Sequence, residues 1–138
     1  RRYYSRRRML TAEAEGRMAA MLHLLPFRTE LGRTTYIYGV ATDPAFRGRG
    51  LASQLMREAM RLIAERGDDA ALLIPTPGKE WLREFYGRFG FAGDVPARFV
   101  SADRFDFGTG DAAADRAMVW RRDSSVPLPE QLTASWHS

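Results

Sequence analysis

The chain has 138 residues, of which 45% are hydrophobic and 28% are charged, values typical of a single globular domain. It contains no cysteine, which excludes disulfides, cysteine nucleophiles and thiolate metal sites and predicts a cytoplasmic location. The formal net charge of +4 favours anionic partners such as phosphates, although a bias toward arginine codons explains the same excess. No apolar run approaches the roughly 20 residues of a membrane helix, so we expect no contact with a membrane.

The first eight residues are basic and aromatic. We interpret residues 1–8 as the solvated start of a strand, and the alternative is an arm that binds nucleic acid. One short run does not make a binding face, so no nucleic-acid partner is expected. The two histidines, His23 and His137, lie far apart in the sequence and form no zinc pattern, so no metal is expected either.

Three strands are predicted next, at residues 9–12, 17–25 and 34–41. The first two form a hairpin around Glu15–Gly16. Both faces of the second strand are apolar apart from His23, which is typical of a strand covered on both sides, and Pro26 closes it. The third strand is rich in β-branched and aromatic residues. Gly39 within it indicates a bulge, or the close approach of another backbone or a ligand.

The second half of the chain alternates between helices and strands. The predicted elements are a helix at 50–66, a strand at 70–74, a second helix from Thr76, and strands at 91–100 and 116–122. Gly67 occupies the position of a left-handed helix cap. Thr76-Pro77 offers an N-cap followed by proline at the first helical position. A strand–helix–strand passage favours parallel neighbours, and the segment from Ser124 is expected to be a loosely held terminus.

The candidate anion site is the passage from residue 40 to residue 52. A strand ends there, a tight loop containing Gly48 and Gly50 follows, and a helix begins. Glycines let the backbone approach a ligand closely, and the first amides of a helix have no internal partners and attract an anion. Arg47 and Arg49 add positive charge, and the structural alternative for both is solvated loop charge.

Two common nucleotide motifs do not fit this loop. The triphosphate-binding loop ends in Gly-Lys-Ser/Thr, whereas Gly50 is followed by Leu51 and Ala52. The dinucleotide fingerprint needs three spaced glycines and a later acidic residue, and the spacing here differs.

Residues 47–52 instead resemble the acetyl-CoA signature of the GNAT superfamily, Arg/Gln-x-x-Gly-x-Gly/Ala. Arg47, Gly50 and Ala52 occupy its three fixed positions. Residues 85–91 resemble a second family element, Tyr-x-x-x-Gly-Phe, on the helix after the next strand. The resemblance covers about residues 8–122, with both motifs in register with the predicted elements.

This resemblance implies an α/β chain with the GNAT fold: a mixed, mostly antiparallel central sheet, a splayed parallel strand pair, and helices on both faces. It implies one acyltransferase domain at residues 1–122 and a C-terminal tail at 123–138. The strand and two helices with which relatives begin are not found. We expect them to lie upstream of Arg1, or another subunit to cover that face, which allows a homodimer.

The same resemblance implies acetyl-CoA as the acyl donor, with no metal. The pantetheine arm would lie between the splayed strands and bond backbone groups, and loop amides would hold the pyrophosphate. The implied cofactor-binding residues are Val40, Thr42, Arg47, Gly48, Arg49, Gly50, Leu51 and Ala52.

Tyr86 is the implied catalytic residue. It would lie near the thioester sulfur, where a phenol can protonate the departing thiolate. The structural alternative is a core aromatic on an apolar helix stripe. The strand before the loop offers no acid to serve as general base. The remaining candidates are His23, whose alternative is a satisfied core histidine, and Glu30 in the preceding link.

The sequence thus predicts an N-acyltransferase in which an amine attacks acetyl-CoA directly in a ternary complex. The acceptor is a small-molecule or peptide amine, whose identity the sequence does not specify. The main rival is a non-catalytic acyl-CoA-binding or regulatory domain, and the second rival is a nucleic-acid-binding module.

Overall fold

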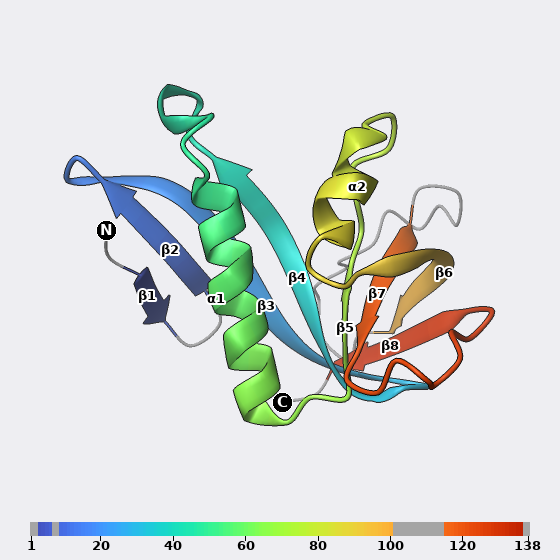
Figure 1. Ribbon diagram of the computed structural model, residues 1–138. Coiled ribbons are helices and arrows are strands. Elements are labelled where there is room, and N and C mark those ends of the chain that lie inside the picture. Colours follow the sequence, from blue (N-terminus) through green and yellow to red (C-terminus); the bar gives the residue numbers. More distant parts are fainter. Residues whose placement is uncertain (1–2, 7–8, 101–114, 137–138) are drawn as a thin grey trace.

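The computed structural model describes residues 3–6, 9–100 and 115–136, whose strands form one sheet of eight strands (Figure 1). Their order is β1-β2-β3-β4-β5-β7-β6-β8. The strands are β1 Tyr3–Arg6, β2 Met9–Ala14, β3 Arg17–Thr29, β4 Gly32–Thr42, β5 Ala70–Leu73, β6 Ala92–Val100, β7 Arg116–Arg121 and β8 Leu132–Trp136. The helices are α1 Leu51–Arg66, α2 Trp81–Gly87 and a 3-10 turn, η1 Pro44–Phe46. Most neighbouring strands are antiparallel, while β4–β5 and β6–β8 are parallel, so the predicted mixed sheet is confirmed.

The hairpin of β2 and β3 turns where it was predicted. Glu15 and Gly16 have φ of 55° and 73°, the two positive values that a two-residue turn matched to strand twist requires. β3 does not end at Pro26 as predicted. The pairing of β3 with β2 ends at His23 and its pairing with β8 begins at Phe27. Pro26 therefore lies where that edge of β3 has no partner, and its missing N–H costs no ladder hydrogen bond.

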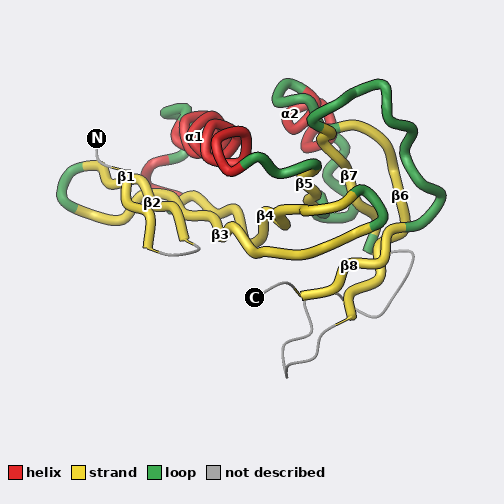
Figure 2. The backbone as a smooth tube through the Cα atoms, turned by 90° about the horizontal axis from the view of Figure 1, so that it is seen from below, coloured by secondary structure: helices red, strands yellow, loops and turns green. Residues whose placement is uncertain are grey.

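Helix α1 packs across β2, β3 and β4 (Figure 2). Its Leu55, Met56, Ala59 and Ile63 are fully buried in one core with sheet residues such as Leu22. Gly67 ends the helix in the predicted left-handed conformation, with φ of 75°.

The two helices of the described residues lie on the same face of the sheet (Figure 2), which differs from the expected helices on both faces. Tyr86 of α2 belongs to the same core as α1. The opposite face carries a second core, built around Phe27 and Tyr36. Strands β6 and β8 curl over this core, so no helix covers it in the described residues.

Strands β4 and β5 form the predicted parallel pair and then separate. They pair at only three positions, from Thr34 opposite Ala70 to Tyr36 opposite Leu72. Strand β4 continues for six more residues, to Thr42, without β5 beside it. The splayed strand pair is therefore present, and it opens toward the loop between β4 and α1.

A buried carboxylate holds the closed end of this pair. Asp68 is 3% exposed, and its Oδ2 accepts a hydrogen bond of 2.5 Å from Thr35 Oγ1. Its Oδ1 lies 3.3 Å from Arg33 Nε. Arg122 adds two bonds of 2.8 Å, from Nε to the Asp68 carbonyl and from Nη2 to the Ala64 carbonyl of α1. This cluster ties β4, α1 and the end of β7 together below the gap.

We expect Asp68→Ala to lower the free energy of unfolding by about 2 kcal/mol, because the buried Thr35 hydroxyl loses its acceptor. Urea unfolding measures this loss. The matched control is Asp69→Ala, whose exposed carboxylate accepts one backbone N–H, that of Arg33, and which should lose less than about 1 kcal/mol. If both variants lose the same free energy of unfolding, the buried bonds of Asp68 do not stabilise the closed end more than an exposed carboxylate does.

The second helix is shorter than predicted. It begins at Trp81 rather than at Thr76-Pro77. Gly78 takes the left-handed conformation, with φ of 85°, which interrupts a helix that would start at Thr76.

The C-terminal segment is more ordered than the expected loose terminus. Residues Leu132–Trp136 form β8, whose Leu132 and Ala134 are fully buried between β6 and β3. Residues 101–114, between the predicted strands at 91–100 and 116–122, lie outside the described residues, as does His137. Within the described ranges, no helix is long and apolar enough to cross a membrane.

Candidate functional site

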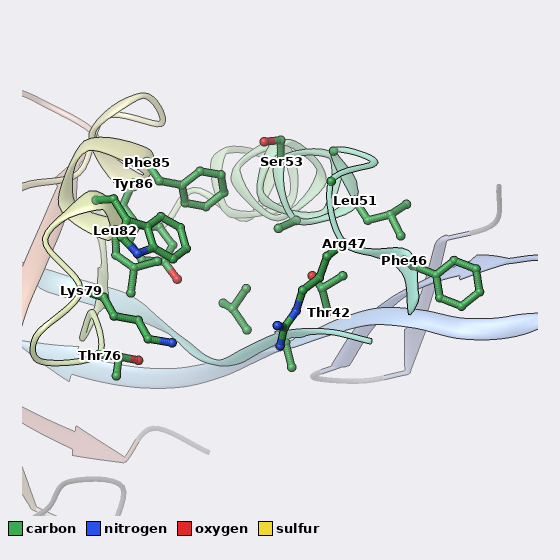
Figure 3. Close-up of a pocket in the computed structure, with 16 residues that line it drawn as sticks. Thr42, Phe46, Arg47, Leu51, Ser53, Thr76, Lys79, Leu82, Phe85 and Tyr86 are labelled. Carbon is green, nitrogen blue, oxygen red and sulfur yellow. The ribbon is translucent and has the colours of Figure 1, made fainter. Parts of the chain in front are cut away.

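A cavity of about 600 Å³ lies between the end of β4, the start of α1, and α2 (Figure 3). Its position follows from the fold, because β5 no longer fills the space beside β4 after Tyr36. The described residues that line it are Val40, Ala41, Thr42, Phe46, Arg47, Gly48, Gly50, Leu51, Ala52, Ser53, Thr76, Lys79, Trp81, Leu82, Phe85 and Tyr86. None of these lining residues is acidic.

The β4 wall carries the bulge that Gly39 predicted. Tyr38 pairs with His23, and Ala41 pairs with Met21. Two residues of β4, Gly39 and Val40, therefore stand opposite the single residue Leu22. Gly39 has a φ of 67°, a conformation that favours glycine. Backbone groups displaced from a ladder in this way are free to bond a ligand in the cavity.

The loop after β4 leads the chain tightly into α1. Asp43 caps η1 by accepting a 2.9 Å hydrogen bond from the Ala45 amide. Gly48 and Gly50 then have φ of 80° and 73°. Gly50 is the N-cap of α1 and has no side chain with which to occupy the helix end.

The start of α1 is an open site for an anion. The first helical hydrogen bond within the helix runs from the Gln54 amide to the Gly50 carbonyl, at 3.1 Å, which leaves the amides of Leu51, Ala52 and Ser53 without a partner inside the helix. No side chain caps this end, and the first turn contains no acidic residue. The helix dipole and these amides favour negative charge here.

The two arginines of the loop have different surroundings. Arg47 lines the cavity and points into it in Figure 3, and it forms no ion pair with a described residue. Arg49 does not line the cavity. Its Nη1 lies 3.3 Å from Glu15 Oε1, and its guanidinium lies 4.9 Å from the centre of the Phe46 ring. Eight of the nine predicted site residues therefore meet in one cavity, and Arg49 is the exception.

Tyr86 lies in the wall opposite the start of α1. Its side chain is 7% exposed, and its ring packs edge-on against Phe85 and Phe91. Burial raises the pKa of the Tyr86 phenol, so the hydroxyl stays protonated at neutral pH. Tyr86 also borders the cavity. It can therefore donate a proton to a group bound there.

Sequence reasoning missed Lys79, the only lysine of the chain. Its side chain reaches the cavity from the side opposite Arg47 (Figure 3). It forms no ion pair within the described residues, so it adds an uncompensated positive charge to the lining. The one sequence signal was that Lys79 is the only lysine in a chain whose other basic side chains of this kind are arginines. Its place at the cavity depends on the link between β5 and α2, which is not helical.

The two candidate bases do not line the cavity. Glu30 lies in the turn before β4, at the other end of that strand, where its carboxylate accepts the Thr133 amide at 2.8 Å. His23 lies on β3 beside the bulge, on the face opposite α1. The described residues contain no group of three or more side chains suited to hold a metal ion.

Residues 1–93 match the family model described as an acetyltransferase (GNAT) domain. The chain belongs to the GNAT acetyltransferase family. This match extends through the loop of Gly48 and Gly50 and through Tyr86, so the resemblance first seen in two short motifs is confirmed. No curated protein matches the chain.

Solved structures show the same GNAT fold. The GNAT family N-acetyltransferase YhbS from Escherichia coli, in complex with CoA, is 20% identical with a TM-score of 0.63, over 94% of this chain and 66% of that one. A GNAT family acetyltransferase from Brucella melitensis, in complex with acetyl-CoA, is 18% identical with a TM-score of 0.61, over the same shares. The PaiA N-acetyltransferase from Thermoplasma acidophilum, in complex with coenzyme A, is 15% identical with a TM-score of 0.55, over 82% of this chain and 59% of that one. This chain thus spans just under two thirds of the first two.

Proposed function

We propose that this GNAT chain is an N-acyltransferase that moves an acetyl group from acetyl-CoA to an amine. The amine attacks the thioester directly, in a ternary complex. The observation that carries the proposal is the uncapped, acid-free start of α1 in the same cavity as the protonated phenol of Tyr86. An anion site and a proton donor on facing walls suit a donor with a phosphorylated end and a thioester end.

The proposed binding mode assigns each part of the donor to part of the cavity. The pyrophosphate binds the amides at Gly50 to Ala52, with Arg47 beside them. The pantetheine arm lies between the splayed strands and bonds backbone groups near Val40 and Thr42, next to the bulge. The thioester sulfur then lies by Tyr86, which protonates the thiolate as the C–S bond breaks.

The decisive assay follows thiol release from acetyl-CoA in the presence of small amines, peptide N-termini and lysine peptides. Because the chain has no cysteine, a thiol reagent reports only the released CoA. Release that depends on an amine supports the proposal. Binding of acetyl-CoA without release for any amine would favour the rival, a non-catalytic acyl-CoA-binding domain.

Arg47→Ala should weaken acetyl-CoA binding by about threefold to tenfold, since one unpaired cation beside a phosphate is lost. The matched control is Arg49→Ala, which removes an equal charge from outside the cavity lining and should change affinity by less than about twofold. Calorimetric titration at two salt concentrations measures both variants. If both variants lose the same affinity for acetyl-CoA, Arg47 contributes only through the net charge of the protein and not through a contact with the phosphate.

A cytoplasmic location, a homodimer, and the division into a domain at 1–122 and a tail at 123–138 stay predictions. The nucleic-acid alternative rested on side chains of residues 1–8, which lie outside those described.

A further inference from the structure

The imidazole of His23 contains a nitrogen that the fold leaves without a partner. Its Nδ1 is buried, and it is the one buried side-chain polar atom among the described residues that forms no hydrogen bond. Buried polar atoms are nearly always paired, so an unpaired one needs an explanation, such as stored strain or a catalytic role. Nothing assigned so far to the acyl donor uses this residue.

This nitrogen lies against the bulge of β4. A Cβ placed on Gly39 would lie 3.3 Å from His23 Nδ1 and 4.0 Å from Cε1 of the same ring, the nearest atoms among the described residues apart from the adjoining Tyr38 and Val40. The imidazole of His23 therefore packs closely against the Gly39 backbone. Val40, the next residue, lines the cavity. One strand segment thus separates Nδ1 from the cavity.

His23 faces away from α1. Its neighbours in β3, Leu22 and Leu24, belong to the core that α1 covers, so the alternation of the strand directs His23 to the opposite face. Tyr38 lies on that face with its ring centre 6.3 Å from the imidazole, and it is 43% exposed, so solvent reaches this face next to His23. The cavity side of the sheet, in contrast, is flanked by α1 and α2 (Figure 3).

Strand β4 itself offers no proton acceptor. Its residues, Gly32–Thr42, include no aspartate, glutamate or histidine. Glu30 bonds the Thr133 amide at the far end of the strand. Of the two candidate bases, His23 is thus the one that lies against the bulge.

We propose that His23 Nδ1 takes the proton of the acceptor ammonium, which reaches the acyl group through the gap between β4 and β5 from the face opposite α1. This role rests on the proposed acyl transfer. The ammonium gives one proton to Nδ1, and the neutral amine forms a C–N bond to the thioester carbon. The C–S bond then breaks, and Tyr86 gives its proton to the sulfur. A second proton from the nitrogen replaces the one lost by Tyr86, and the proton on His23 passes to solvent.

The test compares His23→Gln with the matched control Glu30→Gln in single-turnover acyl transfer. His23→Gln should slow transfer to a strongly basic amine by about 100-fold, the range of general base catalysis. Acetyl-CoA affinity should stay within about twofold, because the imidazole lies outside the donor cavity. Glu30→Gln should change neither quantity.

Two readouts separate a proton acceptor from a structural residue. With a weakly basic amine, which is already neutral at pH 7, the loss in His23→Gln should shrink below about tenfold. Added imidazole should restore transfer in His23→Gly.

The role is overturned if His23→Gln transfers within about threefold of the wild type, or if both amines suffer equally and imidazole restores nothing. A wild-type chain that binds acetyl-CoA yet acylates no amine overturns the proposed function itself, and the role of His23 with it.

Discussion

Tyr86→Phe is expected to lower kcat by about 100-fold, or about 2.7 kcal/mol in the barrier, because the thiolate loses its proton donor. The ring contacts with Phe85 and Phe91 need no hydroxyl, so the variant should fold normally. The affinity for acetyl-CoA should stay within about twofold. Steady-state thiol release and calorimetric titration together measure this split between turnover and binding.

The matched control is Tyr36→Phe, which removes a phenol buried in the other core, outside the cavity lining, and should leave turnover unchanged. The pH profile adds a second check. Since burial raises the pKa of Tyr86 above its usual value of about 10, the phenol keeps its proton through neutral and mildly alkaline pH. Tyr86 should therefore cause no loss of rate until the pH exceeds about 10. Unchanged turnover in Tyr86→Phe would make Tyr86 a core aromatic only.

Ala52→Asp is expected to act in opposite directions on stability and on donor binding. Ala52 lies in the first turn of α1, which has no acidic residue, so a carboxylate there should stabilise the free protein by about 0.5 kcal/mol through the helix dipole. The same charge would repel the pyrophosphate. A repulsion of about 3 kcal/mol between charges a few ångströms apart corresponds to a rise of at least about 100-fold in the Kd for acetyl-CoA.

Ala52→Asn is the control for this change, because asparagine has nearly the same shape as aspartate without the charge. It should weaken binding by less than about tenfold. Urea unfolding and calorimetric titration measure the two effects. If Asp and Asn weaken binding equally, steric blockage explains the loss and the start of α1 is not the anion site.

Local patterns determined much of the fold. The Glu15–Gly16 turn, the span of α1 and its Gly67 cap depend on conformations set by a few neighbouring residues, and these predictions are confirmed. Where a local signal competed with distant contacts, prediction failed. Pro26 signalled a strand end, yet β3 continues because Pro26 still pairs with Thr35 of β4, while the opposite edge of β3 has no partner at that residue. Residues 132–136 gave no strong pattern, and they become a strand by pairing with β6 and β3.

For the site, the sequence by itself pointed to the loop through Gly48 and Gly50 and to Tyr86, because each belongs to a short motif that resembles a GNAT family element, and the structure places both at one cavity. The tertiary structure decided which charges share the cavity: Arg49 pairs with Glu15 instead, and Lys79 enters from the other wall. It also placed His23 against the Gly39 bulge. These placements depend on strand pairing and on the splay of β4 from β5, contacts between residues far apart in the chain that no local pattern encodes.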